Sequence, residues 1–368
     1  LKPPLIKEGE LLYRAFGGDG AMLASNKPRN PARYLIGGFL AVIVVGSLLL
    51  GLPAASQGEH ISYLDALFTA TSAVCLTGLV VVDTGTFYST FGHVVIMLLI
   101  FTGSLGFMTM ATLIFIFLGR RISLRDRLVV KEALNQETMA NLVPLVKAVV
   151  SMTVLLELLG AALLCLRFVP LMGWRRGVFF SLFHAISAFG NAGFDLFGGY
   201  NSLTRFPTDY LVNGTILVLF IIGGLGFTVV FELARKIFRG HRLSLHTRMV
   251  VIITAILLLA GTAAILALEY HNPDTMGSLT PGEKVFTALF TAAAPRSSGF
   301  RVLNTGVHPP AVLLILMALM FIGAAPASTG GGVKITTFGV VVIAVIALIR
   351  GQEEPVLFER RLSLAFDS

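Results

Sequence analysis

The chain has 368 residues, of which 55% are hydrophobic and only 13% are charged, and its mean hydropathy is +0.84. This composition excludes an ordinary soluble domain, in which about a quarter of the residues are charged, and predicts a protein embedded in a lipid bilayer. The formal net charge of +8 does not indicate nucleic-acid binding, because the basic residues stand in short runs between apolar stretches and form no basic, aromatic face.

The N-terminal segment 1–30 mixes charged and apolar positions. Because Lys2 and Arg14 interrupt any apolar run, this segment does not match a cleavable signal sequence and is interpreted as a cytosolic tail. The two cysteines, Cys75 and Cys165, lie within apolar sequence and are interpreted as packing residues. The seven histidines lack ligand spacing, so no metal site is inferred from them.

Six stretches of the chain are apolar and long enough to cross a bilayer as helices, which requires about twenty residues. Four of them carry no charge, whereas the third contains Lys147 and Glu157 and the sixth is interrupted by glycines. In chain order, the predicted spans are Leu35–Leu52, Val94–Leu118, Leu142–Leu166, Tyr210–Phe231, Met249–Leu268 and Ala311–Ile349.

A shorter apolar stretch lies between the two spans of each successive pair. These stretches are Tyr63–Val74, Val178–Phe189 and Lys284–Ala294. At about twelve residues each they are too short to span, so they predict half-helices that enter the membrane and return on the same side.

Basic residues are concentrated in the two loops that connect one pair of spans to the next. They cluster at residues 120–131 and 235–248, and the positive-inside rule therefore makes both loops cytoplasmic. The opposite loops carry mainly acidic residues, although Arg175 and Arg176 run against this trend. This topology predicts a cytoplasmic N-terminus and half-helices that enter from outside.

The three half-helices belong to a repeated sequence. The copies read ALFTATSAVCLTGL ending at Leu79, SLFHAISAFGNAGF ending at Phe194, and ALFTAAAPRSSGF ending at Phe300, the third being one residue shorter. The following spans repeat as well, with GSLGF from Gly103 and GGLGF from Gly223. Each copy therefore corresponds to one span, one half-helix and one span.

A cytoplasmic motif marks the start of each later copy. It reads RISL at Arg121 and RLSL at Arg242 and Arg361, so a fourth copy is expected to begin there. The predicted fold is an all-α polytopic membrane protein with tandem units of span, pore helix and span around a central pore, three of them in this sequence and a fourth beyond residue 368. The predicted domains are the tail 1–30, the first unit 31–120, the second unit 121–241, the third unit with a glycine-rich loop 242–360, and the start of a fourth unit 361–368.

Each repeat carries a glycine at the same position after its half-helix. A dehydrated cation needs oxygen ligands, and rings of backbone carbonyls supply them without a buried charge. Glycine reaches the positive φ values that turn consecutive carbonyls toward an axis. Packing glycines are the alternative interpretation, but packing alone does not account for a threefold recurrence. The predicted ion-binding residues are Leu76, Thr77, Gly78, Asn191, Ala192, Gly193, Ser297, Ser298 and Gly299.

The sixth span is interrupted by a glycine-rich segment that also contains Pro326 and cannot form a regular helix. Irregular backbone at membrane depth indicates a water-lined cavity, so this segment is interpreted as a gate below the filter. A nucleotide-binding loop is excluded, because the glycine order is wrong and no strand precedes it. The predicted gate residues are Gly323, Ser328, Thr329, Gly330, Gly331, Gly332 and Lys334.

Four motifs resemble the Ktr/Trk/HKT superfamily of potassium transporters, and most closely the membrane subunit of bacterial Ktr-type systems. They are SAVCLTGL at Ser72–Leu79, FMTMATL at Phe107–Leu113, EALNQ at Glu132–Gln136 and STGGGVK at Ser328–Lys334. The resemblance covers about residues 31–368 and implies four tandem units around one ion pathway.

The resemblance implies K⁺ uptake across the cytoplasmic membrane, with K⁺ bound at the filter. Gly78 favours K⁺, because members that favour Na⁺ commonly carry serine at that position, and a Na⁺-permeable member of the same superfamily is the alternative. The implied partners are a second copy of the subunit and a cytosolic ring of RCK-type nucleotide-binding subunits, so a nucleotide would act only through that ring. Na⁺ as an activator stays open.

Three further positions have more than one interpretation. Glu157 is an acid within a span, and either a functional role or a structural partnership with Arg296 or with a backbone donor fits it. Arg296 precedes the third filter segment, where it either repels cations from one side or braces the loop through hydrogen bonds, and the second role is preferred. Lys334 follows the gate glycines and is expected to favour the closed gate. No set of residues fits an enzyme, since no paired acid or serine and base recurs at matching depth.

Overall fold

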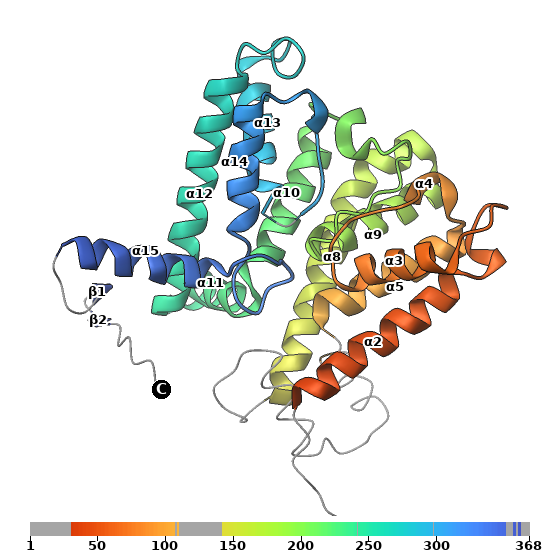
Figure 1. Cartoon of the computed structure of the whole chain (residues 1–368), viewed down its shortest axis with the longest axis horizontal. Helices are drawn as coiled ribbons and strands as arrows, with labels where there is room; N and C mark the ends of the chain where they lie inside the picture. The colour runs from red at the N-terminus through yellow and green to blue at the C-terminus, as the bar shows by residue number, and fades with distance from the viewer. Residues whose placement is uncertain are drawn as a thin grey trace, which may run out of the picture.

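The computed structural model describes residues 31–106, 109, 142–240, 242–296, 298–350, 356–357 and 360–361. Their regular secondary structure is almost entirely helical, which confirms the predicted all-α class (Figure 1). The exception is an antiparallel pair of two-residue strands, β1 (Val356–Leu357) and β2 (Arg360–Arg361). The expected tail, the expected start of a fourth unit and the motifs at 107–113 and 132–136 lie wholly or almost wholly outside the described residues.

The first unit consists of α2 (Pro31–Leu50), the pore helix α3 (Tyr63–Val74) and α5 (Thr90–Leu105). The short helices η1 (Pro53–Ala55) and α4 (Thr84–Phe87) lie in its connections. The bounds of α3 agree with the predicted half-helix. Ser62 fixes its start, because the Ser62 hydroxyl accepts a hydrogen bond from the Asp65 amide at 3.2 Å.

The second unit has the same order, with longer helices. It contains α8 (Leu142–Met172), the pore helix α9 (Trp174–Phe189), η2 (Ser202–Arg205), α10 (Tyr210–Leu225) and α11 (Phe227–Arg239). The pore helix begins at Trp174 and not at Val178, because the Gly173 turn joins it almost directly to α8.

The third unit contains α12 (Leu245–Glu269), the pore helix α13 (Pro281–Ala293), η3 (Thr305–Val307), α14 (Pro310–Phe321) and α15 (Ile335–Ile349). A capping box between Thr280 and Glu283 starts α13, with the Thr280 amide 2.8 Å from the Glu283 carboxylate. In Figure 1, α15 runs across the direction of α14, and the predicted irregular segment separates the two helices.

The prediction of one continuous span over Tyr210–Phe231 is wrong. The chain breaks at Gly226, and α11 is turned by 107° from α10. Gly226 has φ +88° and ψ 145°, a conformation that ends the helix and that only glycine adopts readily. Gly106, at the matching place in the GSLGF motif, has φ +76° and ψ 138° and ends α5 at Leu105, so the predicted span Val94–Leu118 is not one straight helix either.

Two described helices are long and apolar enough to cross a membrane, Val143–Met172 and Leu245–Glu269, and a third candidate arises if the bent pair Tyr210–Arg239 counts as one span. Four further apolar helices in the described part of the chain are shorter. They are Ile36–Leu50, Thr90–Leu105, Pro310–Phe321 and Ile335–Ile349.

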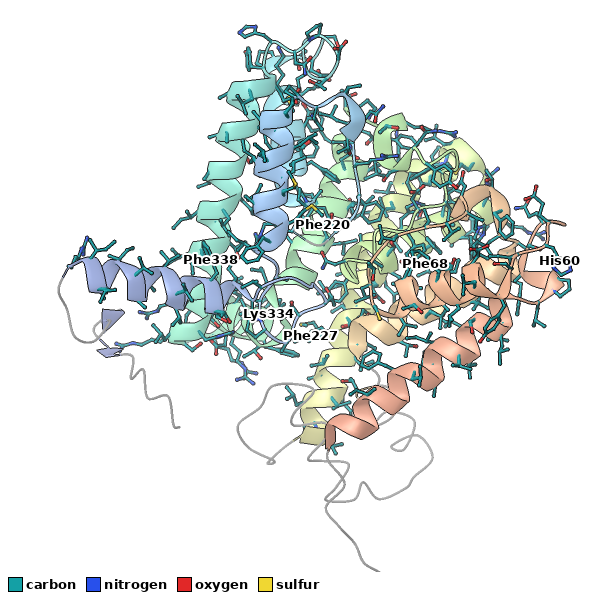
Figure 2. All side chains as sticks on the ribbon, in the orientation of Figure 1. His60, Phe68, Phe220, Phe227, Lys334 and Phe338 are labelled. Carbon is teal, nitrogen blue, oxygen red and sulfur yellow. The ribbon has the colours of Figure 1, made fainter. Side chains whose placement is uncertain are left out.

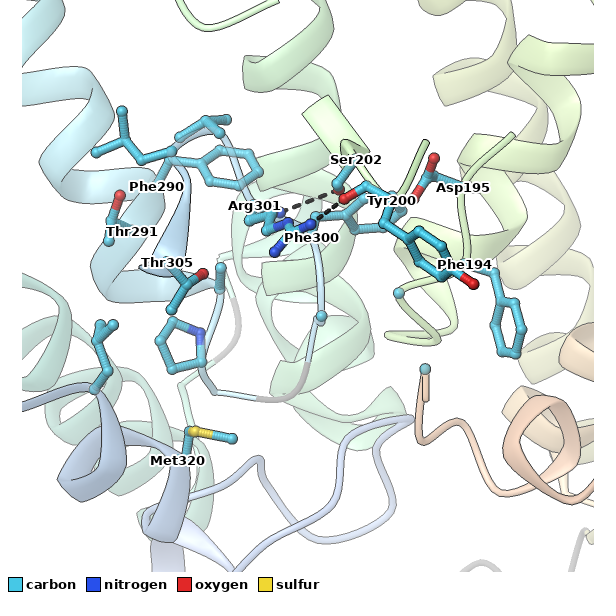
Figure 3. A pocket seen from close by; sticks show the side chains of 18 of the residues that line it. Phe194, Asp195, Tyr200, Ser202, Phe290, Thr291, Phe300, Arg301, Thr305 and Met320 are labelled. Carbon is cyan, nitrogen blue, oxygen red and sulfur yellow. Dashed lines mark hydrogen bonds between the residues drawn. The ribbon is translucent and has the colours of Figure 1, made fainter. Parts of the chain in front are cut away.

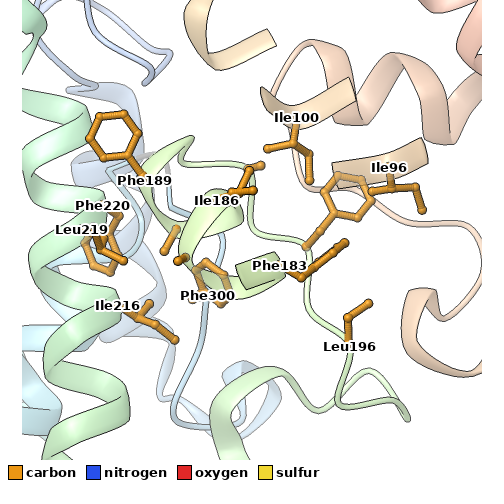
Figure 4. Packing of buried hydrophobic residues seen from close by; sticks show 14 of the residues in the cluster. Ile96, Ile100, Phe183, Ile186, Phe189, Leu196, Ile216, Leu219, Phe220 and Phe300 are labelled. Atoms are coloured by element: carbon orange, nitrogen blue, oxygen red, sulfur yellow. The ribbon is translucent and has the colours of Figure 1, made fainter. Parts of the chain in front are cut away.

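The main core forms where α5, α9 and α10 pack together (Figure 4). Phe183 and Phe189 of α9 are buried between Ile100 of α5 and Phe220 of α10. His184 is fully buried beside them, with its Nδ1 2.7 Å from the Phe180 carbonyl and its Nε2 3.3 Å from the Leu196 amide. These contacts make His184 a packing residue that also holds the loop after α9.

Replacing Gly103 of α5 with alanine should destabilise the protein, because the added Cβ would lie 2.2 Å from the Val74 carbonyl oxygen at the end of α3. Overpacking of this kind costs about 1–3 kcal/mol. Thermal unfolding of the protein in detergent should show the lower midpoint.

The matched control is Gly37→Ala on α2, where an added Cβ has nothing within 4 Å. Alanine is favoured over glycine in a helix by up to about 1 kcal/mol, so this control should keep or raise the midpoint. Equal losses in both variants would contradict the close packing of α5 on α3.

Candidate functional site

The first two pore helices end in the same left-handed turn. Leu76 has φ +56° and Asn191 has φ +54°. The amides of the next residues, Thr77 and Ala192, donate to carbonyls five residues earlier at 2.8 and 2.9 Å. This pattern is a Schellman motif, which pairs the last helical carbonyls and directs the chain out of the helix axis. The repeat seen in the sequence is therefore a repeat of backbone conformation.

The third copy has a different turn. The Ser298 amide donates to the Ala294 carbonyl four residues earlier at 3.0 Å, and Ser297 lies outside the described residues. The missing residue in the third copy accounts for the tighter connection. The glycine that follows, Gly299, nevertheless has φ +74°, against +75° for Gly78 and +73° for Gly193.

The three glycines meet backbone to backbone. A Cβ added to Gly78 would lie 2.5 Å from the Ala192 carbonyl oxygen, and a Cβ added to Gly193 would lie 2.9 Å from Cα of Gly299 and 3.0 Å from the Ser298 carbonyl oxygen. No side chain fits between segments at these distances. Residues 76–78, 191–193 and 298–299 are therefore brought together from three units, and we call them the glycine segments.

The other residues of the glycine segments differ in exposure. Thr77 and Gly299 are exposed, Leu76 is half-buried, and Ala192 and Ser298 are buried. The pore helices α3, α9 and α13 end directly before the segments, so the negative ends of three helix dipoles face the same region. The described segments contain no carboxylate, and their oxygens are those of backbone carbonyls, two hydroxyl groups and one amide.

The irregular segment between α14 and α15, residues 322–334, folds back on itself. The Gly323 amide donates to the Val333 carbonyl at 3.1 Å, and the Ala324 amide donates to the Gly331 carbonyl at 3.0 Å. A Cβ on Gly323 would lie 1.9 Å from the Gly331 carbonyl oxygen, so glycine is required at this crossing. We call residues 322–334 the glycine-rich loop.

The second unit binds the glycine-rich loop through its broken helix. The last carbonyls of α10 have no partner within the helix, and two of them, on Gly223 and Gly224, accept bonds from the loop amides of Thr329 at 3.2 Å and Ala325 at 3.0 Å. The Phe227 amide, at the start of α11, donates to the loop in return (Figure 2). The break in α10 thus supplies the partners that the loop needs at membrane depth.

Two basic side chains reach the glycine-rich loop. Arg296 donates from Nη2 to the Gly323 carbonyl at 3.3 Å, and Lys334 donates from Nζ to the Gly330 carbonyl at 2.9 Å. Arg296 therefore braces the loop and makes no ion pair with Glu157 among the described residues. Glu157 is 3% exposed, and its Oε1 has no hydrogen-bond partner in the described structure. Sequence reasoning did not identify the loop carbonyl as the partner of Arg296.

A cavity of about 580 Å³ opens beside the glycines Gly78, Gly193 and Gly299 (Figure 3). Its lining is mostly apolar and includes the side chains of Asp83, Asp195 and Arg301. Its residues come from the loops after the three pore helices and from α13 and α14.

Residues 25–365 match the family model described as TrkH, cation transport protein. The Ktr system potassium uptake protein B of Bacillus subtilis is 45% identical over 332 residues, which cover 90% of this chain and 74% of that protein. The potassium/sodium uptake protein NtpJ of Enterococcus hirae is 37% identical over 92% of this chain and 74% of that protein.

A crystal structure of the potassium transporter TrkH from Vibrio parahaemolyticus has the same fold, with a TM-score of 0.67 and 20% identity over 92% of this chain and 67% of that one. These matches confirm the resemblance seen in the motifs and show a transport protein and not an enzyme. The chain belongs to the TrkH family of cation transport proteins.

Proposed function

We propose that this protein takes up K⁺ through a filter formed by the backbone carbonyls of the glycine segments. The observation that carries the proposal is the convergence of Gly78, Gly193 and Gly299 at nearly equal φ values, with the ends of three pore helices behind them. Carbonyl dipoles and helix ends attract a monovalent cation and allow it to leave again, since no carboxylate binds it tightly.

Two relatives support K⁺ as the transported ion. The Bacillus subtilis relative is a potassium uptake protein, and the Enterococcus hirae relative is a potassium/sodium uptake protein. Gly78 favours a K⁺-selective transporter, and a Na⁺-permeable transporter is the second candidate function.

The glycine-rich loop is proposed to be the gate. It is held by hydrogen bonds from α10, from Arg296 and from its own Lys334, and such bonds can be released without unfolding a helix. Lys334 stabilises the closed loop in this proposal, because its ammonium group donates to the Gly330 carbonyl at 2.9 Å.

The assembly is part of the same proposal. We propose a homodimer in the cytoplasmic membrane, with the N-terminus in the cytoplasm and a cytosolic ring of RCK-type nucleotide-binding subunits as regulator. Tandem units at 31–120, 121–241 and 242–360 line three sides of the pathway, and a fourth unit that begins at residue 361 lines the remaining side. The name of the Bacillus subtilis relative, a Ktr system protein, supports a multi-subunit system.

The outer cavity is proposed to be the entrance for the cation. Asp195 lies in the loop after the second glycine segment, and its Oδ1 accepts from the Phe197 amide at 3.0 Å. Burial is the main cause that raises the pKa of Asp195 to about 6, and the nearby Asp83 raises this pKa further. The Phe197 amide and the two arginines Arg301 and Arg205 lower the pKa and so oppose part of the increase. The carboxylate is therefore charged above about pH 6 and neutral below it.

Serine at position 78 should reduce the preference for K⁺. The residue has φ +75°, and a side chain there would meet the Ala192 carbonyl. The measurement is Rb⁺ uptake into proteoliposomes, with K⁺ and Na⁺ as competitors. The preference for K⁺ over Na⁺ should be roughly tenfold lower in Gly78→Ser than in wild type, which is the factor for ~1.4 kcal/mol of local strain.

The matched control is Gly58→Ser, at a glycine with φ +97° and nothing within 4 Å of its added Cβ, which should keep the wild-type preference. Unchanged selectivity in Gly78→Ser, or no Rb⁺ flux in the wild-type protein together with its partner subunits, would contradict the proposal.

Lowering the external pH through about 6 should reduce Rb⁺ uptake at low Rb⁺ concentrations, because protonation of Asp195 removes one negative charge from the entrance. The loss should be roughly two- to fivefold, as for one partly screened charge near the pathway. Asp195→Asn should show the reduced uptake already at pH 7.5 and should lose this part of the pH dependence.

Asp274→Asn removes an exposed carboxylate outside the cavity lining and serves as the control. Uptake that depends on pH equally in wild type and Asp195→Asn would contradict this role.

A further inference from the structure

The side chain of Asn191 does not point toward the other glycine segments. Asn191 is 2% exposed, and its Nδ2 donates to Oγ1 of Thr329, in the glycine-rich loop, at 2.7 Å and to the Phe220 carbonyl at 3.2 Å. A residue of one glycine segment is thus bonded directly to the proposed gate. These two residues are 138 positions apart in the chain.

Thr329 completes the connection from the other side. It is 6% exposed, and its hydroxyl donates to the Phe189 carbonyl at 3.0 Å while it accepts from Asn191. Phe189 is the last residue of α9, so its carbonyl has no partner within the helix. We call the bonds that join Asn191, Thr329 and the Phe189 carbonyl the latch. Its polar atoms are paired in a buried site, where an unpaired group is costly.

Gly223 makes room for the latch. A Cβ at this position would lie 2.0 Å from the Phe189 carbonyl oxygen, 2.9 Å from Oγ1 of Thr329 and 3.0 Å from Nδ2 of Asn191. Only a bare backbone therefore allows α10 to pass this close to the end of α9. The Gly223 carbonyl also accepts a hydrogen bond from the Thr329 amide, so the same residue makes room for the latch and binds its backbone.

The first unit shows that the close approach alone does not require a polar latch. In that unit Gly103 lies against the Val74 carbonyl in the same way as Gly223 lies against the Phe189 carbonyl. A Cβ added to Gly103 would lie 2.2 Å from the Val74 carbonyl oxygen. Leu76 takes the place of Asn191 with nearly the same φ. The backbone geometry is thus shared by both units. The polar side chain, Asn191, occurs in the second unit, whose helix α10 binds the glycine-rich loop.

We propose that Asn191 is a positioning residue that couples the second filter segment to the gate loop through Thr329. This inference rests on the proposed function, in which the glycine segments select the ion and the glycine-rich loop gates it. Movement of Thr329 away from α9 removes the 2.7 Å bond from the Asn191 amide, which keeps its longer bonds to the Phe220 and Phe189 carbonyls, and it removes the hydroxyl donor from the Phe189 carbonyl. The left-handed turn before Gly193 then loses its link to the glycine-rich loop, so ion selectivity and gate position change together.

The test uses four variants of the full-length protein with its partner subunits in proteoliposomes. Thr329→Val removes the hydroxyl at nearly constant shape, and Thr329→Ser keeps it. Asn191→Leu removes the amide, and Leu76 shows that leucine fits this backbone conformation. The fourth variant combines Thr329→Val with Asn191→Leu. The matched control is Thr215→Val on α10, where the hydroxyl bonds, among the residues that the structure describes, only to the Leu211 carbonyl of its own helix.

Two quantities are measured for each variant, the initial rate of Rb⁺ uptake and the ratio of inhibition by K⁺ and Na⁺. Thr329→Val is expected to raise the basal uptake and to lower the K⁺ preference, each by about three- to tenfold, because it removes the hydroxyl that bonds to both Asn191 and the Phe189 carbonyl. Thr329→Ser should stay close to wild type. The effect of the double variant should be smaller than the product of the two single effects, because both changes remove the bond between Asn191 and Thr329.

The proposal is overturned if Thr329→Val leaves the K⁺ preference unchanged, or if the effects of Thr329→Val and Asn191→Leu multiply in the double variant. If Asn191→Leu does not fold, the comparison of Thr329→Val with Thr329→Ser decides alone. Failure of the proposed function is a separate result, because it would appear as missing or unselective Rb⁺ uptake in the wild-type protein.

Discussion

The contact among Gly78, Gly193 and Gly299 is the constraint on which the rest of the structure depends. Three units can meet this closely only where the backbone has positive φ and no Cβ. The pore helices must therefore end just before the glycines, and the first two end in the same left-handed turn. The helices α2, α8 and α12 pack against α3, α9 and α13, respectively.

The glycine-rich loop raises a second physical problem, because irregular backbone inside a membrane leaves polar groups without water. The break of α10 at Gly226 solves it. A helix end has free carbonyls, and the loop amides of Ala325 and Thr329 bind two of them. The break and the loop are therefore complementary, and a continuous α10 would leave both with unpaired groups.

The charged residues near the glycine segments and the glycine-rich loop follow a simple arrangement. Among the described residues, the glycine segments carry no acid, and helix ends and carbonyls supply the negative potential. In the proposed function, carboxylates such as Asp195 line the cavity outside the glycines, where they attract cations without binding them in the filter. The basic residues Arg296 and Lys334 bind carbonyls of the glycine-rich loop and so stabilise its fold.

Sequence patterns alone determined the membrane class, the helical class, the pore helix at Tyr63–Val74 and the three equivalent glycines, because hydrophobic length and a repeated motif are local properties. The length of the uncharged apolar stretch carried the predicted span past Gly226, since glycine is common within membrane helices and its φ is not encoded by hydropathy. The bond between Asn191 and Thr329 was decided only by the tertiary structure. A hydrogen bond across 138 residues depends on how α9, α10 and the loop pack, and no local pattern specifies that packing.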